Sequence, residues 1–188
     1  MNRKLSVQKL CASALLIAVG TIIPMISPLK LIIPPASFTL ASHVAIFIAM
    51  MISPAVAVSV ALGTTAGFFL AGAFPIVVVL RAASHLVFVI IGSFYIHKRP
   101  FMVNSFKESR LFSLFIGLIH AACEVLVVTA FYLGDQMGSA YYESGFFQSV
   151  IILVGFGTVV HSMVDFEISI AIVKVLQKQK GFSALINS

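Results

Sequence analysis

Long apolar stretches separated by short turns are the feature that most constrains this chain of 188 residues. A helix needs about 20 apolar residues to cross the hydrocarbon core of a bilayer. The pattern predicts an all-α fold, a single-domain bundle of six transmembrane helices at about 8–27, 39–53, 54–72, 75–96, 110–133 and 146–176.

Composition excludes most alternatives to a membrane protein. Hydrophobic residues make up 60% of the chain and charged residues only 10%, whereas soluble domains average about 45–50% and about 25%. A soluble fold of this size would expose apolar patches larger than monomers tolerate. A soluble enzyme, a nucleic-acid-binding domain and a disordered chain are therefore excluded.

Lysine and arginine residues gather on one side of the expected bundle. They precede the first helix, lie between the fourth and fifth, and end or follow the sixth: Arg3, Lys4, Lys9, Lys98, Arg99, Lys107, Arg110, Lys174, Lys178 and Lys180. The opposite side carries Lys30. Because cytoplasmic loops are enriched in Lys and Arg, we expect a multi-pass cell-membrane protein with both termini in the cytoplasm. The net charge of +6 then reflects topology and not nucleic-acid binding.

The sequence carries no signature of a nucleotide-driven motor or of a cysteine metal site. There is no GxxxxGK[ST] nucleotide-binding loop, and Cys11 and Cys123 lie in apolar context without metal-ligand spacing. We therefore expect a chain that is not an enzyme, with no catalytic residues, no cofactor and no bound metal. If the chain transports, the energy must come from another subunit.

Two pairs of polar residues lie within expected spans, where ionisable groups are costly and usually functional. Arg81 and His85 are four residues apart on the fourth helix, and His120 and Glu124 are four apart on the fifth. Counting 1.5 Å per residue places these groups in the outer half of the bilayer. Arg81 can hold a carboxylate through two hydrogen bonds. The alternative is an ion pair with Glu124 that only locks two helices together.

The sixth helix carries a further polar pair, His161 and Asp165, together with Glu167 on another face. His161 falls near mid-depth and Asp165 in the inner half. We expect Asp165 and Glu167 outside the outer pocket, in a partner interface or a helix-packing hydrogen bond. An alternative is an intramembrane metal-dependent hydrolase in which His120, Glu124, His161 and Asp165 bind one metal ion.

The segment after the first helix, PLKLIIPPASFTL, is apolar and rich in proline, which is unusual for an exposed loop. It is suited to fold over the bundle as a lid, with Ser37 and Phe38 close to a site; an interfacial segment is the alternative. Further candidates follow at the outer ends of helices, where tyrosines also commonly serve as interfacial anchors: Ser42, His43, Tyr142 and Gln148.

The first helix has small residues at Ala14 and Ala18. This spacing lets another helix approach closely in lipid. The contact could be a partner interface or packing within the same bundle. A purely structural subunit of a larger membrane complex is thus a further hypothesis, although such a subunit would not need Arg81 in the outer half.

Together, these features resemble the S component, the substrate-binding membrane subunit, of an energy-coupling factor (ECF) vitamin transporter. The segment from Pro35 to Met50, with Gly63–Gly67 and Leu80–His85, is most similar to the bacterial niacin-type members. The resemblance implies an outward-facing pocket formed by the first loop and helices 4 to 6. It also implies docking through Ala14 and Ala18 onto a transmembrane coupling subunit shared with two cytoplasmic ATPases.

The resemblance implies capture of a small vitamin for ATP-driven uptake, with nicotinate ahead of nicotinamide, pantothenate and tryptophan. The expected substrate-binding residues are Arg81, His85, His120, Glu124, Ser37, Phe38, Tyr142 and Gln148. The chain departs from the thiamin and riboflavin types, whose pockets often use tryptophan, because it contains no Trp. This difference favours a small substrate.

Overall fold

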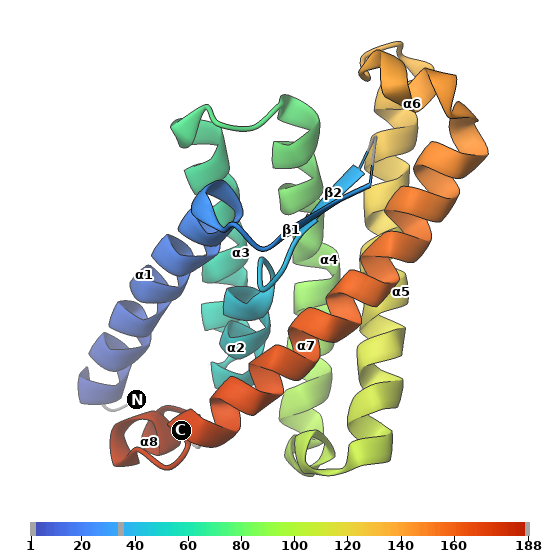
Figure 1. The fold of residues 1–188 in the computed structure, drawn as a ribbon. Coiled ribbons are helices and arrows are strands. Elements are labelled where there is room, and N and C mark those ends of the chain that lie inside the picture. Colours follow the sequence, from blue (N-terminus) through green and yellow to red (C-terminus); the bar gives the residue numbers. More distant parts are fainter. Residues whose placement is uncertain (1–2, 34–35, 187–188) are drawn as a thin grey trace.

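The computed structural model describes residues 3–33 and 36–186, without the side chains of residues 3–6, Ile32 and Ser37. Helices dominate the fold, and one short hairpin interrupts them (Figure 1). The elements, in chain order, are α1 (Arg3–Ile26), β1 (Lys30–Ile33), β2 (Ala36–Thr39), α2 (Val44–Ile52), α3 (Pro54–Ala71), α4 (Ile76–Lys98), η1 (Pro100–Asn104), α5 (Phe106–Leu133), α6 (Ser139–Glu143), η2 (Phe147–Phe156), α7 (Gly157–Leu176) and α8 (Lys180–Ile186).

Within the described ranges, five helical segments are long and apolar enough to cross a membrane: Val7–Ile26, Pro54–Ala71, Ile76–Lys98, Phe106–Leu133 and Phe147–Leu176. They correspond to the first, third, fourth, fifth and sixth expected spans. The last joins η2, which has π-helical hydrogen bonding, to α7. Many large apolar side chains on these helices are exposed, as a lipid-facing surface requires. The fold is therefore that of a helical polytopic membrane protein.

The second expected span, at 39–53, is instead the nine-residue helix α2. Nine residues rise about 14 Å, which is too short to cross the hydrocarbon core. Every residue of α2 is buried, so its apolar character reflects the protein core and not contact with lipid. Ser53 ends α2, and its side chain then accepts a hydrogen bond from the Val56 amide at the start of α3.

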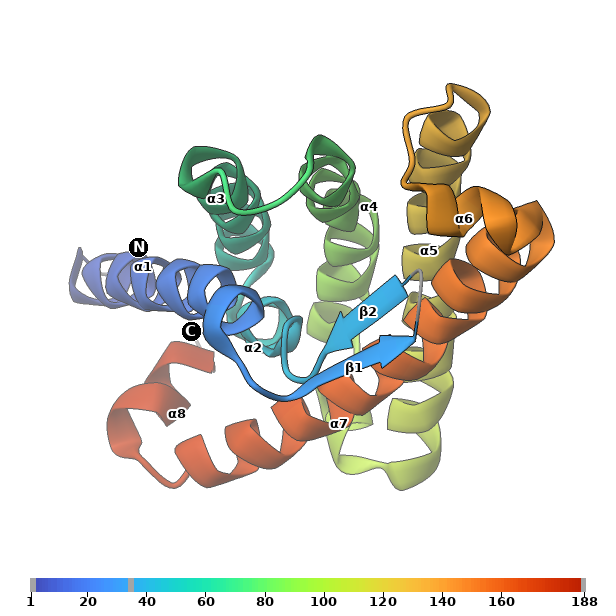
Figure 2. The same cartoon turned by 45° about the horizontal axis from the view of Figure 1, so that its top comes forward.

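The expected apolar lid is a two-stranded antiparallel hairpin, in which Lys30 pairs with Thr39 and Leu31 with Phe38. Residues 34 and 35, between the strands, lie outside the described part of the chain. In Figure 2 the hairpin extends from the end of α1 and the start of α2 toward α5 and α7, and Lys30, Phe38 and Thr39 of its strands line the cavity described below. It therefore lies where a cover over the centre of the bundle would lie.

The beginning of α1 and the end of α8 lie at the same end of the bundle (Figure 1). The α4–α5 connection, which contains η1, is also at that end, whereas the α3–α4 and α5–α6 connections are at the other. The basic residues in the first turns of α1, around η1, and at or after the end of α7 thus share one end. This arrangement agrees with the charge distribution on which the expected topology was based.

Candidate functional site

A cavity of about 170 Å³ lies beneath the hairpin, between α2, α3, α4, α5 and α7. Pockets for drug-sized ligands span about 300–1,000 Å³, so this one suits a smaller solute. Its lining combines polar and aromatic side chains from elements far apart in the sequence. The described lining residues are Pro24, Lys30, Phe38, Thr39, Ser42, His43, Ile46, Thr64, Phe68, Phe74, Val78, Arg81, Ala82, His85, Glu124, Thr158 and His161.

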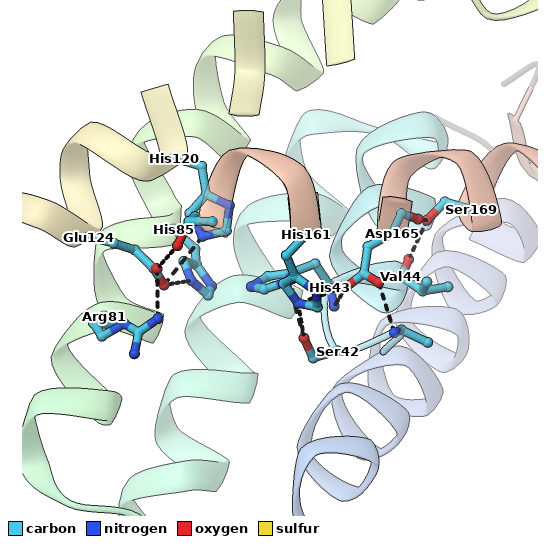
Figure 3. Close-up of polar contacts among 12 residues, drawn as sticks. Ser42, His43, Val44, Arg81, His85, His120, Glu124, His161, Asp165 and Ser169 are labelled. Carbon is cyan, nitrogen blue, oxygen red and sulfur yellow. Dashed lines mark hydrogen bonds and ion pairs between the residues drawn. The ribbon is translucent and has the colours of Figure 1, made fainter. Parts of the chain in front are cut away.

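One wall of the cavity carries a buried ion pair between α4 and α5 (Figure 3). Arg81 Nη2 donates to Oε2 of Glu124 at 2.8 Å, and the Thr158 hydroxyl donates to the same oxygen at 2.6 Å. The Arg81 side chain is 20% exposed and that of Glu124 is 4% exposed. Arg81 Nε has no hydrogen-bond partner among the described residues. The ion pair therefore fixes the position of the guanidinium. Because only Nη2 donates to Glu124, other N–H groups of Arg81 can donate to a ligand.

Imidazole rings occupy the floor of the cavity, around His43 at the start of α2. The His43 ring centroid lies 4.9 Å from His85, 4.7 Å from His120 and 5.0 Å from His161. His85 and His120 Nε2 each lie 3.5 Å from Oε1 of Glu124. We call His43, His85, His120 and His161 the histidine cluster. It offers ring stacking and both donor and acceptor nitrogens at one place.

The turn that precedes α2 and contains His43 is stabilised by Asp165 of α7. Its carboxylate accepts from the Ala41 amide at 2.8 Å and from the His43 amide at 2.9 Å. Ala41 has φ of 67°, a left-handed conformation that is unfavourable for residues other than glycine. A carboxylate at a helix N-terminus satisfies free amides and complements the helix dipole. Asp165 thus positions His43 through the backbone.

Phe38 connects the hairpin to α7. Its ring centroid lies 5.6 Å from that of His161, and a Cβ at Gly157 would lie only 2.5 Å from Phe38 Cζ. Because Gly157 has ordinary helical backbone angles, the close approach of the ring explains the glycine here. The hairpin is therefore seated directly against α7.

Four of the expected substrate-binding residues meet at the site: Phe38, Arg81, His85 and Glu124 line the cavity. His120 lies in contact with His85 and is fully buried. The backbone of Ser37 pairs with Ile32 in the hairpin, but its side chain is outside the described part.

The structure places two expected site residues away from the cavity lining. Tyr142 accepts from the Met137 amide and donates to the Tyr132 carbonyl, which ties together the α5–α6 connection. Gln148 is exposed on η2. Burial raises the pKa of the nearby Tyr141 hydroxyl above its ordinary value.

His161 is closer to the site than its expected mid-depth position indicated, because α7 crosses the bundle obliquely (Figure 1). It lines the cavity, with Nε2 2.9 Å from the Ser42 hydroxyl. Thr158 was not singled out from the sequence. The sequence feature that could have identified Thr158 is its position one helical turn before His161, on the same side of α7. Glu167 is separate from the cavity lining and pairs with Arg110 at 2.6 Å.

The geometry does not favour the metal-dependent hydrolase hypothesis in the form derived from the sequence. Among the described residues, two groups have ligand atoms close enough to hold a metal ion: His43, His85 and His120, and His43, His161 and Asp165. Neither contains all four residues of the hypothesis. His43 lies between its two pairs.

Fold and site together define a polytopic membrane protein with a small, buried, polar and aromatic cavity under a hairpin. The chain is 41% identical over 177 residues to the niacin transporter NiaX of Lactococcus lactis subsp. cremoris, covering 94% of this chain and 78% of that protein. The chain therefore belongs to the family of this transporter, which confirms the resemblance to the niacin-type S components. No family model and no solved structure matches the chain.

Proposed function

We propose that this protein is the substrate-binding S component of an ECF-type importer and that it captures niacin for uptake. The observation that carries the proposal is the position of Arg81 in a cavity of small volume, in a chain related to a niacin transporter. Glu124 and Thr158 hold the guanidinium in place, so a carboxylate meets a preorganised cation.

In this proposal nicotinate binds with its carboxylate on Arg81 and its ring beside the histidine cluster. A planar guanidinium is suited to a carboxylate because it donates two parallel hydrogen bonds. His43, His85 and Phe38 line the cavity and offer aromatic surfaces to the pyridine ring. A bulky substrate is disfavoured by the small volume and by the seating of Phe38 against Gly157.

Binding experiments with a panel of solutes test the substrate assignment. The purified chain is titrated calorimetrically with nicotinate, nicotinamide, pantothenate and tryptophan. We expect tight one-to-one binding of nicotinate, weaker binding of nicotinamide because it lacks the charge, and none of the larger two. Preference for pantothenate or tryptophan would move the assignment to another S-component substrate. Silence across the panel from folded protein would favour a structural subunit.

The proposed topology places both termini in the cytoplasm, with α2 completing a six-helix arrangement as a short inner helix. The basic residues at the end of the bundle that carries the termini support this orientation. The cavity lining includes Phe74 of the α3–α4 connection, which is at the end opposite the termini (Figure 1), so the cavity would then open to the outside. This direction is the one required for uptake.

Energy for transport is proposed to come from a transmembrane coupling subunit and two cytoplasmic ATPases. Ala14 and Ala18 are exposed on α1, whereas Gly20 and Thr21 of the same helix approach Thr64 and Gly67 of α3. The small-residue face thus remains available for a second protein.

Uptake assays separate substrate binding from docking. The double variant Ala14→Leu, Ala18→Leu should bind niacin with unchanged affinity but abolish uptake in cells that also produce the partner subunits. Ala171→Leu, at an exposed position of α7, is the matched control and should keep uptake. Full uptake by the double variant would show that the partner docks elsewhere.

A further inference from the structure

The chain contains five histidines, and only His97 lies outside the histidine cluster. His97 is instead near the end of α4, where Nδ1 lies 2.8 Å from the Ser93 carbonyl oxygen. Within the cluster, the ligand atoms of His43, His85 and His120 lie within 4.8 Å of one another. Placing imidazoles from α4, from α5 and from the residue before α2 together is costly inside a membrane-spanning bundle, where such polar groups usually serve a function.

His120 is the residue whose polar atoms most need a partner. It is fully buried, its Nε2 has only a long contact of 3.5 Å with Glu124 Oε1, and neither ring nitrogen makes a hydrogen bond of good geometry among the residues described. Buried polar atoms normally find a partner. The ring of His120 lies 4.7 Å from both His43 and His85, so a cation held between the three rings would supply it.

Asp165 holds the His43 ring in the way that carboxylates commonly hold metal-binding histidines. Oδ2 of Asp165 lies 3.2 Å from His43 Nδ1, which leaves Nε2 of His43 for a ligand. Metal-binding histidines generally hydrogen-bond a carboxylate through the other ring nitrogen. Both Asp165 oxygens already accept backbone amides. Asp165 is therefore better suited to support His43 than to bind a metal itself in the group with His161.

We propose that His43, His85 and His120 bind one divalent transition-metal ion of the Zn²⁺ class at the floor of the cavity. Neutral imidazole nitrogens suit such ions, and three protein ligands leave a position open to a further ligand. His43 and His85 line the cavity, so that position faces the substrate space. There the ring nitrogen of the substrate, whose carboxylate the proposed function assigns to Arg81, would complete the coordination; this part rests on that function.

The buried charges are compatible with a cation. Arg81 carries one positive charge, and Glu124 and Asp165 each carry one negative charge, all beside the histidine cluster. Lys30 contributes a positive charge at an exposed position of the lining. A divalent ion offsets the buried acids and strengthens attraction for an anionic substrate. Glu124 Oε1, at 3.5 Å from both His85 and His120, is placed to support two of the ligands.

The test uses the full chain, purified without a histidine tag and stripped with a chelator. Zn²⁺ is titrated calorimetrically, and Co²⁺ is added separately to follow its visible absorption. We expect one ion per chain and the intense absorption of four-coordinate Co²⁺ with nitrogen ligands. Zn²⁺ stoichiometry well below one, or the spectrum of hydrated Co²⁺, would overturn the proposal. This outcome depends on the unaltered chain alone and not on the folding of any variant.

Variants assign the ligands. His43→Gln and His120→Gln should each weaken Zn²⁺ binding by more than the ~10–100-fold that loss of a supporting residue causes. His97→Gln, outside the cluster, should bind Zn²⁺ as the unaltered chain does. Loss of Zn²⁺ binding in His161→Gln with retention in His120→Gln would place the ion in the other group and contradict the assignment.

Failure of this proposal is distinguishable from failure of the proposed function. Niacin binding is measured in chelator-treated protein with and without added Zn²⁺, and we expect at least a tenfold gain with the metal. Tight niacin binding by metal-free protein, unchanged by Zn²⁺, would reject the metal and keep the transporter. Zn²⁺ binding without niacin binding under either condition would reject the substrate and the open coordination position assigned to it.

Discussion

Arg81 Nη2 and Glu124 Oε2 lie 2.8 Å apart and join α4 to α5 inside the bundle. The pair has two consequences, since it crosslinks two helices and also fixes the guanidinium at the cavity wall. A buried ion pair is not by itself a source of stability, because desolvation offsets the attraction. Its position beside a cavity argues for a role in binding.

Replacing Glu124 with glutamine should impair both stability and binding. The change keeps the side-chain size but leaves the partly buried Arg81 without its counterion, and the about 3–5 kcal/mol lost on breaking a fully buried pair is the upper limit of the cost. We expect a clearly lower thermal unfolding midpoint in detergent and weaker niacin binding. Glu143→Gln, at an exposed position in α6, is the matched control and should change neither quantity. An unchanged midpoint for Glu124→Gln would show that the pair is dispensable.

Thr158 provides a test that leaves all charges in place. Thr158→Val removes the 2.6 Å hydrogen bond to Glu124 with little change of shape. Hydrogen bonds to charged groups contribute about 1.5–3 kcal/mol, and we expect a loss of that order with reduced niacin affinity. Thr65→Val is the control, because the Thr65 hydroxyl donates only to the Ala61 carbonyl of its own helix. Equal effects of the two changes would contradict the role given to Thr158.

The spans were predictable because hydropathy reports helix length directly, as the segment Ile76–Lys98 illustrates. The length of α2 was not predictable in the same way. Its run of apolar residues has the composition of a lipid-facing span, yet all of it is buried in protein, and composition does not distinguish the two environments. The segment was predicted to be an apolar lid, but its hairpin strands were not predicted, because they carried no turn signature such as Asn-Gly.

Ala41 should respond to glycine in the opposite direction from its neighbour Ala45. A left-handed conformation costs about 1–2 kcal/mol for a residue with a side chain, and Ala41 has φ of 67°. Ala41→Gly should therefore leave stability unchanged or raise it by up to about 1 kcal/mol, once the added chain entropy is counted. Ala45→Gly, within α2, should lower it by about 1 kcal/mol. Thermal unfolding midpoints of the two variants provide the comparison, and a loss in Ala41→Gly equal to that in Ala45→Gly would contradict the strained turn.

Gly157→Ala should weaken niacin binding although alanine favours helices. The new Cβ would lie 2.5 Å from Phe38 Cζ, so the ring must move and the hairpin with it. Gly138→Ala is the control, because a Cβ there meets nothing within 4 Å. Calorimetric affinities measure the difference. Unchanged affinity in Gly157→Ala would mean that the position of Phe38 does not matter for the substrate.

The site was only partly predictable from the sequence. Arg81 and Glu124 could be paired because both lie in long regular helices, where depth follows from counting residues. His43 and His161 could not be placed in this way. His43 follows an irregular turn held by Asp165, and His161 lies on an oblique helix that continues from a π-helical segment. Such long-range contacts leave no local pattern.

The most direct test of the account is calorimetric titration of nicotinate into the purified chain and into Arg81→Gln. We predict one tight site in the unaltered chain and no measurable binding in the variant, with circular dichroism showing that the variant remains helical. Equal affinity of the two proteins for nicotinate would contradict the assignment of Arg81, and no binding by either folded protein would contradict niacin capture itself.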